Sequence, residues 1–170
     1  RLKFLPIWGF IFLLSRASAI DVWFPDTLLV APNSTIDVPL STSDLSNEDI
    51  ISFFIKFSYD DSVIAFDNVI KANTLTQNWG NPTINNMGDG TVIIAMYGIS
   101  PLLGSGELFN ITFNVGNELG AYSELAIIDF YFNEGQPDVN TIDGGIYISD
   151  IEGCMDSIAI NYSAEAVEDD

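Results

Sequence analysis

Carboxylates are the side chains most available for chemistry in this sequence. There are 24 Asp and Glu against five Lys and Arg, with no His and one Cys in 170 residues. A glycosidase needs two acids about 5–9.5 Å apart in a cleft, one of them with a raised pKa. The adjacent acids Asp60 and Asp61 lie at a turn, and Glu48 and Asp49 precede an apolar segment, so solvation at the surface accounts for both pairs. Asp129, among apolar neighbours, fits an outward binding face better than a catalytic pair.

Other catalytic groups are missing from the sequence. Without His there is neither the usual general base near neutral pH nor the commonest metal ligand. A Ser or Thr nucleophile, or Cys154, would therefore lack its partner. No phosphate-binding loop, dinucleotide fingerprint or zinc-ligand spacing occurs. The sequence predicts a protein that is not an enzyme.

A calcium loop is the remaining metal site to test. Residues 138–144, Asp-Val-Asn-Thr-Ile-Asp-Gly, are similar to the start of one. An EF-hand needs Asp or Asn at the fifth position, then Gly, and Glu at the twelfth. Those positions hold Ile142, Asp143 and Ser149, so the segment fails as an EF-hand. We expect no cofactor and no dedicated metal site, with weak structural Ca²⁺ binding by acidic loops as the alternative.

The charge of the chain excludes two classes of partner. A formal net charge of −19 argues against binding nucleic acid or an anionic membrane surface. Beyond residue 19 the cations are Lys56 and Lys71, with no Arg to clamp a phosphate or carboxylate ligand. What remains is recognition of a partner at the surface.

The first nineteen residues have the pattern of a secretory signal peptide. A basic start, Arg1-Leu-Lys3, is followed by an apolar run over residues 4–14, and Ala17-Ser-Ala19 forms a small-residue cleavage site. The apolar run is well short of the about 20 residues that span a membrane. We expect residues 1–19 to be removed and the remaining chain to be secreted, extracellular or at the cell surface, without membrane insertion. An uncleaved anchor is the alternative.

From Ile20 the apolar residues alternate with polar ones, and turn residues interrupt them at short intervals. The clearest case is 50–59, where Phe53, Ile55 and Phe57 point to one side of a strand. No stretch sustains a helical period. The pattern predicts an all-β fold, an antiparallel β-sandwich of about nine strands with jelly-roll topology. The expected strands are 20–24, 35–40, 50–59, 63–69, 77–81, 91–97, 107–115, 124–133 and 145–149.

Five motifs follow one another in a characteristic order. They are TIDVPL at 35–40, FSYDDSVI at 57–64, GTVIIAMY at 90–97, GSGELFNITF at 104–113 and IDGGI at 142–146. The order resembles that of the cohesin domain, the bacterial module that docks dockerin-bearing enzymes onto scaffold proteins. The resemblance implies a β-sandwich domain over residues 20–150 that binds a protein partner and catalyses nothing. Asp61 stands where the family usually has Pro.

The last twenty residues have a different pattern. Residues 153–170, GCMDSIAINYSAEAVEDD, resemble a short Cys-containing repeat of bacterial surface proteins, whose second Cys would follow Asp170. We expect residues 151–170 to be the start of such a repeat. A second Cys there would account for Cys154, which would otherwise be an unpaired thiol in an exported chain.

The expected partner-binding face is the outward side of strand 50–59 and its neighbour. Phe54 and Lys56 point away from the core-facing residues of that strand. Strand 91–97 is apolar after Thr91, so its periodicity leaves both orientations open. If Ile93, Ala95 and Tyr97 join the core, Ile94 and Met96 face outward. In cohesins the dockerin lies on such a face, and the resemblance places Ser52 and Phe54 where an Asn and an Asp often form hydrogen bonds. The predicted partner-binding residues are Ser52, Phe54, Lys56, Ile94 and Met96.

A second prediction concerns polysaccharides. Trp79 is flanked by the amides of Gln77 and Asn81, and exposed aromatic rings beside amides stack on sugars in carbohydrate-binding modules. Trp23 and Tyr131 would extend such a platform, unless these rings belong to the core. The leading hypothesis is a secreted docking module for a protein partner, with dockerin-bearing polysaccharide-degrading enzymes as the partners that the resemblance implies. The alternatives are a carbohydrate-binding module and a structural spacer of a cell-surface adhesin.

Overall fold

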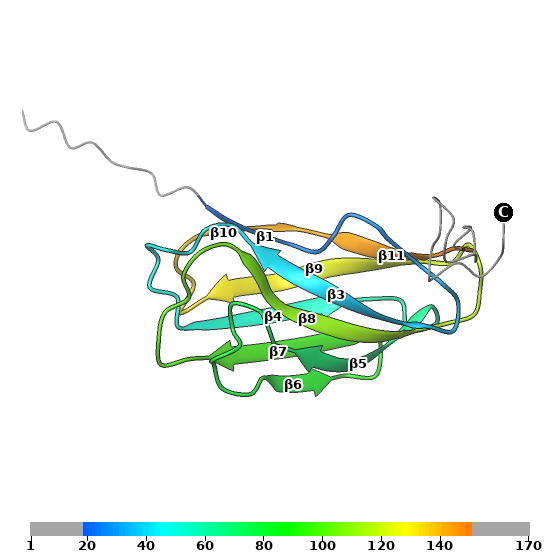
Figure 1. The fold of residues 1–170 in the computed structure, drawn as a ribbon, viewed down its shortest axis with the longest axis horizontal. Coiled ribbons are helices and arrows are strands. Elements are labelled where there is room, and N and C mark those ends of the chain that lie inside the picture. Colours follow the sequence, from blue (N-terminus) through cyan, green and yellow to red (C-terminus); the bar gives the residue numbers. More distant parts are fainter. Residues whose placement is uncertain (1–18, 151–170) are drawn as a thin grey trace, which may run out of the picture.

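Residues 19–150 are described by the computed structural model and form a sandwich of two β-sheets (Figure 1). No helix long and apolar enough to cross a membrane is found in this range. The strands are β1 Ile20–Trp23, β2 Leu28–Val30, β3 Thr35–Thr42, β4 Ser52–Ser58, β5 Ile64–Ile70, β6 Thr83–Asn86, β7 Thr91–Tyr97, β8 Gly106–Val115, β9 Tyr122–Phe132, β10 Val139–Ile142 and β11 Gly144–Ile148. The expectation of an all-β sandwich is confirmed.

The two sheets divide the strands as a jelly roll does. One sheet has the order β10-β1-β3-β8-β5, and the other has the order β2-β11-β9-β4-β7-β6. Most neighbours are antiparallel, but β1 pairs with β10 and β2 pairs with β11 in parallel. Both sheets are therefore mixed at one edge, where the sequence pattern predicted antiparallel pairs throughout.

The strand boundaries differ from the sequence prediction in three places. β2 and β10 are additional short strands of three and four residues at sheet edges, too short to show alternation. The strand expected at 77–81 is wrong, because those residues form turns, and the strand of this region is β6. In the turns, Trp79 N donates to Thr76 O and Gln77 N donates to Thr74 O, so this backbone is satisfied locally rather than by a sheet.

Alternation along each central strand builds the core between the sheets. Phe53, Ile55 and Phe57 of β4 are at most 2% exposed and face β8 of the opposite sheet, with Phe53 stacked on Phe109 at 5.6 Å between ring centroids. Burying one such aromatic side chain stabilises the fold by about 1.5–3 kcal/mol. The same alternation sends the intervening residues of β4 to the outer surface of the six-stranded sheet.

Tight turns fix the register of β4 and β7. Tyr59 N donates to Gly90 O at 2.8 Å, and a Cβ on Gly90 would lie 2.3 Å from Tyr59 O. Gly90 also has φ +76°, a conformation that favours glycine. A residue without a side chain is therefore required where β7 begins beside the end of β4.

Candidate docking face

The outward side of β9, β4 and β7 forms a candidate site. These three strands are neighbours in the middle of the six-stranded sheet. The register pairs Phe54 with both Tyr131 and Ala95, and Lys56 with both Asp129 and Ile93. Each of these side chains alternates with a buried neighbour on its own strand. We call this surface the docking face: Ser52, Phe54, Lys56, Ile93, Ala95, Tyr97, Asp129 and Tyr131.

Aromatic rings occupy the middle and one end of the docking face. Phe54 and Tyr131 stack with their ring centroids 4.9 Å apart and an interplanar angle of 11°. Tyr97, across from Ser52 on the next strand, is 70% exposed, and Tyr131 is 38% exposed. Aromatic side chains that are partly open to solvent on a rigid sheet are common anchors of protein interfaces.

Charged groups lie beside the aromatic rings. Lys56 and Asp129 are directly opposite on β4 and β9, an arrangement in which opposite charges attract across a sheet. The outward position predicted for Asp129 is confirmed, as are the outward positions of Ser52, Phe54 and Lys56. The pairing of β4 with β9 shifts register between Lys56 and Phe57, and Ile128, the β9 residue at this bulge, is 52% exposed. The docking face thus combines an apolar centre with a few charges.

The outward placement predicted for Ile94 and Met96 is wrong. Ile94 is fully buried and Met96 is 2% exposed, because they pair with Ile55 and Phe53, which face the core. Residues paired across strands share a face, so β7 sends Thr91, Ile93, Ala95 and Tyr97 outward instead. The sequence does hold a weak signal, because the outward set contains Thr, Ala and Tyr while the inward set is aliphatic throughout. Tyr97 is the functional candidate that periodicity alone missed.

The exposed position predicted for Trp79 is also wrong. Trp79 is 6% exposed, stacks on Phe53 at 6.0 Å and donates from Nε1 to Ser100 O at 3.0 Å. Gly98 makes this possible, since a Cβ there would lie 2.2 Å from the indole. A ring closed in this way cannot stack on a sugar. Gln77 and Asn81 are exposed, but they flank a core residue rather than a platform.

Lys71 holds the segment that contains Trp79. Its Nζ donates to Trp79 O and to Gly80 O, the latter at 3.2 Å. Thr76 Oγ1 donates to Leu108 O at 2.6 Å in the same segment. These contacts attach the loop between β5 and β6 to the sandwich, so one of the two lysines of the domain has a structural partner.

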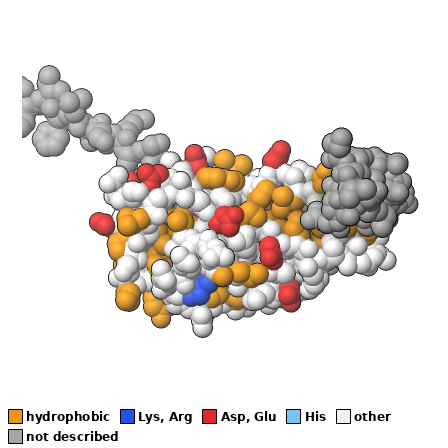
Figure 2. Space-filling model, viewed as in Figure 1, with side chains coloured by type: hydrophobic (Ala, Val, Ile, Leu, Met, Phe, Trp, Pro, Cys, Tyr) orange, Lys and Arg blue, Asp and Glu red, His pale blue; other side chains and the backbone are white. Residues whose placement is uncertain are grey.

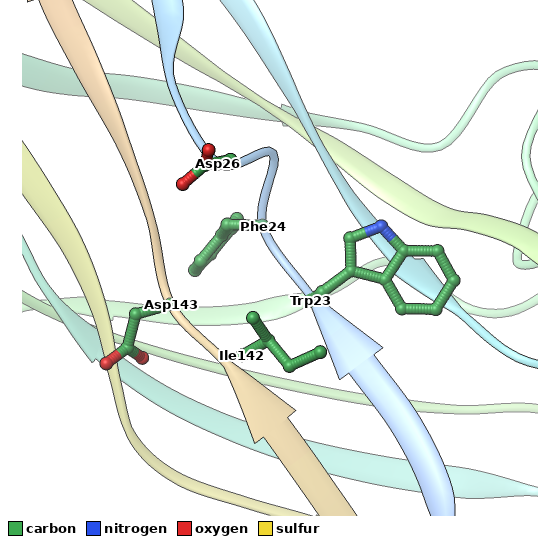
Figure 3. Close-up of a pocket in the computed structure, with 5 residues that line it drawn as sticks. All are labelled: Trp23, Phe24, Asp26, Ile142 and Asp143. Atoms are coloured by element: carbon green, nitrogen blue, oxygen red, sulfur yellow. The ribbon is translucent and has the colours of Figure 1, made fainter.

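A surface depression lies beside Trp23. It is lined by Trp23, Phe24, Asp26, Ile142 and Asp143 (Figure 3). The Trp23 indole points away from the two carboxylates, which lie on the opposite side of the depression (Figure 3). Asp143 accepts a hydrogen bond from Ile127 N at 2.7 Å and so positions β9 beside β10. This hydrogen bond supports a structural role for Asp143.

Asp60, one of the acids considered for hydrolysis, has the environment of a turn residue rather than of a general acid. Asp60 is exposed and accepts from Ser62 Oγ at 2.6 Å and from Ser62 N at 2.9 Å, and these bonds lower its pKa. Bonds from Ser46 lower the pKa of Asp44 in the same way. A general acid needs the opposite shift. Among residues 19–150, no three His, Cys, Asp or Glu side chains gather as metal ligands would.

Solved structures share this fold. A cohesin from scaffoldin B of Acetivibrio cellulolyticus, in complex with a Cel5 dockerin, matches with TM-score 0.65 and 18% identity over 78% of this chain and 100% of that chain. The solution structure of CaCohA2 from Clostridium acetobutylicum matches with TM-score 0.66 and 18% identity, over 78% and 92%. A non-cellulosomal cohesin of the archaeon Archaeoglobus fulgidus matches with TM-score 0.63 and 20% identity, over 77% and 91%.

Sequence comparison agrees with the fold. No curated protein sequence matches this chain. The family model described as the cohesin domain matches residues 22–148, from β1 to the last residue of β11. That match spans both sheets and every strand of the docking face. The chain therefore belongs to the cohesin domain family.

Proposed function

We propose that this domain is a non-catalytic docking module that binds a dockerin-bearing protein on the docking face. The observation that carries the proposal is the stacked Phe54–Tyr131 pair beside the exposed Tyr97, on the outward side of a sheet in a cohesin fold. The Acetivibrio cellulolyticus cohesin was crystallised with a dockerin, and so was a Clostridium thermocellum type I cohesin, Coh-OlpC. The partner of this chain would be recognised in the same general manner.

Apolar contact would dominate recognition. The resemblance places Phe54 where many cohesins have a hydrogen-bonding side chain, and its ring stacks on Tyr131 instead. Desolvated aromatic side chains at the centre of an interface contribute most of its binding energy. Ser52, Lys56 and Asp129 surround them and would select the orientation of the partner.

The proposed role requires export. Residues 1–18, which carry most of the predicted signal peptide, lie outside the described residues, as does the predicted repeat at 151–170. We propose that the leader is cleaved after Ala19 and that the domain of residues 20–150 acts outside the cell or at its surface, where secreted enzymes are available as partners.

Capture from the culture medium of the source organism tests the proposal. The immobilised chain is incubated with secreted proteins in the presence of calcium, and bound proteins are identified by mass spectrometry. We expect captured proteins to share a dockerin segment with duplicated calcium loops. Phe54→Ala should reduce capture at least tenfold, since losing a central aromatic anchor costs about 2 kcal/mol or more.

A matched aromatic deletion controls for damage to the fold. Tyr147 of β11 is 37% exposed on the same sheet but outside the docking face. Tyr147→Ala should leave capture unchanged while circular dichroism shows both variants folded. If the folded wild-type chain captures no dockerin-bearing protein, the docking proposal is wrong and a spacer role in a surface protein is favoured.

A further inference from the structure

Exposed hydrophobic side chains continue from the docking face over one end of the sandwich. Ile51 is 47% exposed, Tyr97 is 70% exposed and Ile99 is fully exposed. Their segments are adjacent, because Gly98 N donates to Ile51 O at 2.9 Å. Ser52 pairs with Tyr97, so this end surface is continuous with the docking face.

An acidic depression lies against the same end surface. It has a volume of about 410 Å³ and is lined by Asp49, Ile51, Ser52, Asn133, Glu134 and Gln136. Its walls are tied together by Asn133, whose Oδ1 accepts from Ile51 N at 3.0 Å and from Ser52 N at 3.3 Å. Two exposed carboxylates, Asp49 and Glu134, lie in its lining, and no basic side chain does.

The charge of this depression differs from that of the docking face. On the sheet, Lys56 is directly opposite Asp129, which balances the charges locally. In the depression the carboxylates of Asp49 and Glu134 have no such opposite charge in the lining. A partner side chain that brings a positive charge would therefore be attracted there, and an acidic one would be repelled.

We propose that the docking surface extends over Ile51, Tyr97 and Ile99, and that the depression receives a lysine or arginine side chain of the partner. The occupant is an amphipathic segment of the partner that is apolar where it covers the end surface and basic at one edge. The inference rests on the proposed function, because it treats the docking face as the centre of the same interface. Hydrophobic contact beside the depression would exclude water and strengthen the attraction between the charges.

A pair of synthetic helical peptides tests the inference with the 170-residue chain. The peptides have the same leucine face and differ only at one flank, which carries lysines in one and glutamates in the other. Binding is measured by fluorescence anisotropy at about 0.15 M salt, where exposed long-range electrostatics are largely screened. We expect the lysine peptide to bind the wild-type chain about fivefold more tightly than the glutamate peptide.

Variants that neutralise the two carboxylates of the depression test whether they cause the preference for the lysine peptide. Asp49→Asn combined with Glu134→Gln should reduce the preference to less than about twofold, and Asn is suited to the φ of +48° at position 49. The control combines Asp61→Asn with Glu118→Gln, two exposed acids in the loops at the opposite end of the sandwich. This control makes the same change in net charge and should keep the fivefold preference.

Two results would overturn the inference. Equal loss of preference in both double variants would show that the peptides respond only to the net charge of the chain. Absence of binding by either peptide to the wild-type chain would show that the end surface does not accept an amphipathic segment. Neither result bears on the proposed function, which the capture experiment with Phe54→Ala tests separately. A failure of this inference is therefore distinguishable from a failure of the proposed function.

Discussion

Phe54 and Trp79 are both aromatic, but their surroundings place one on the outer surface of the sheet and the other in the core. Phe54 lies on the outward side of β4 and stacks on Tyr131. Trp79 lies in a polar stretch of sequence but closes the core beside Phe53, and its one polar atom is satisfied by Ser100 O. Polar neighbours along the chain therefore do not predict an exposed ring, because the ring's hydrogen-bond donor can be satisfied by a distant carbonyl.

Replacing Trp79 tests whether its ring stabilises the core. Trp79→Ala should lower the free energy of unfolding by about 3–5 kcal/mol, because it leaves a cavity and removes a buried hydrogen bond. Gln77→Ala, at an exposed neighbouring position, should change it by less than about 0.5 kcal/mol. Urea unfolding followed by tryptophan fluorescence and circular dichroism measures both. Similar small effects for the two variants would contradict the core placement of Trp79.

At the scale of elements, the pairing of β4 with β7 decides which side chains reach the docking face. The pairs Phe53–Met96 and Ile55–Ile94 place the aliphatic residues of β7 in the core. A shift of one residue in this register would bring Ile94 and Met96 to the surface and bury Tyr97. The turn at Gly90, where β7 begins against Tyr59, opposes such a shift.

Two glycines of one turn provide a matched test at this scale. Gly88 and Gly90 have nearly equal φ angles, +75° and +76°, but a Cβ would meet nothing within 4 Å at Gly88 and would lie 2.3 Å from Tyr59 O at Gly90. Gly88→Ala should cost about 1–2 kcal/mol, the penalty of a left-handed conformation. Gly90→Ala should cost at least about 2 kcal/mol more, because β7 must move away from β4. Thermal unfolding measures the difference, and equal costs would argue against the close approach.

At the scale of the whole molecule, negative charge surrounds a neutral core. Residues 19–150 contain eighteen Asp and Glu but only two Lys, and acidic side chains are dispersed over the face seen in Figure 2. One of the two lysines, Lys71, is bonded to backbone carbonyls. Like charges spread over a compact domain repel one another and favour its unfolding, although they keep it soluble.

Salt should therefore stabilise the domain at neutral pH. Raising NaCl from about 0.01 M to 0.5 M shortens the screening length several-fold and weakens this repulsion. We expect the melting temperature at pH 7 to rise by several degrees, as measured by scanning calorimetry. Near pH 4, where about half of the carboxylates are protonated, the rise should be much smaller. A fall in melting temperature at pH 7 would show that attractive ion pairs outweigh the repulsion.

Alternation and turn residues were sufficient to predict the fold class and eight of the strands. They also predicted the outward position of Phe54, Lys56 and Asp129, because successive side chains of a half-buried strand point alternately to the core and to solvent. The scarcity of positive charges, with Lys56 and Lys71 as the only cations of residues 19–150, was also evident from the sequence alone. Only the tertiary structure decided the face of β7 and the burial of Trp79. The sequence of an apolar strand does not show which of its two faces is buried, because the register with a partner strand decides this. A tryptophan in a loop is buried or exposed according to what packs against it.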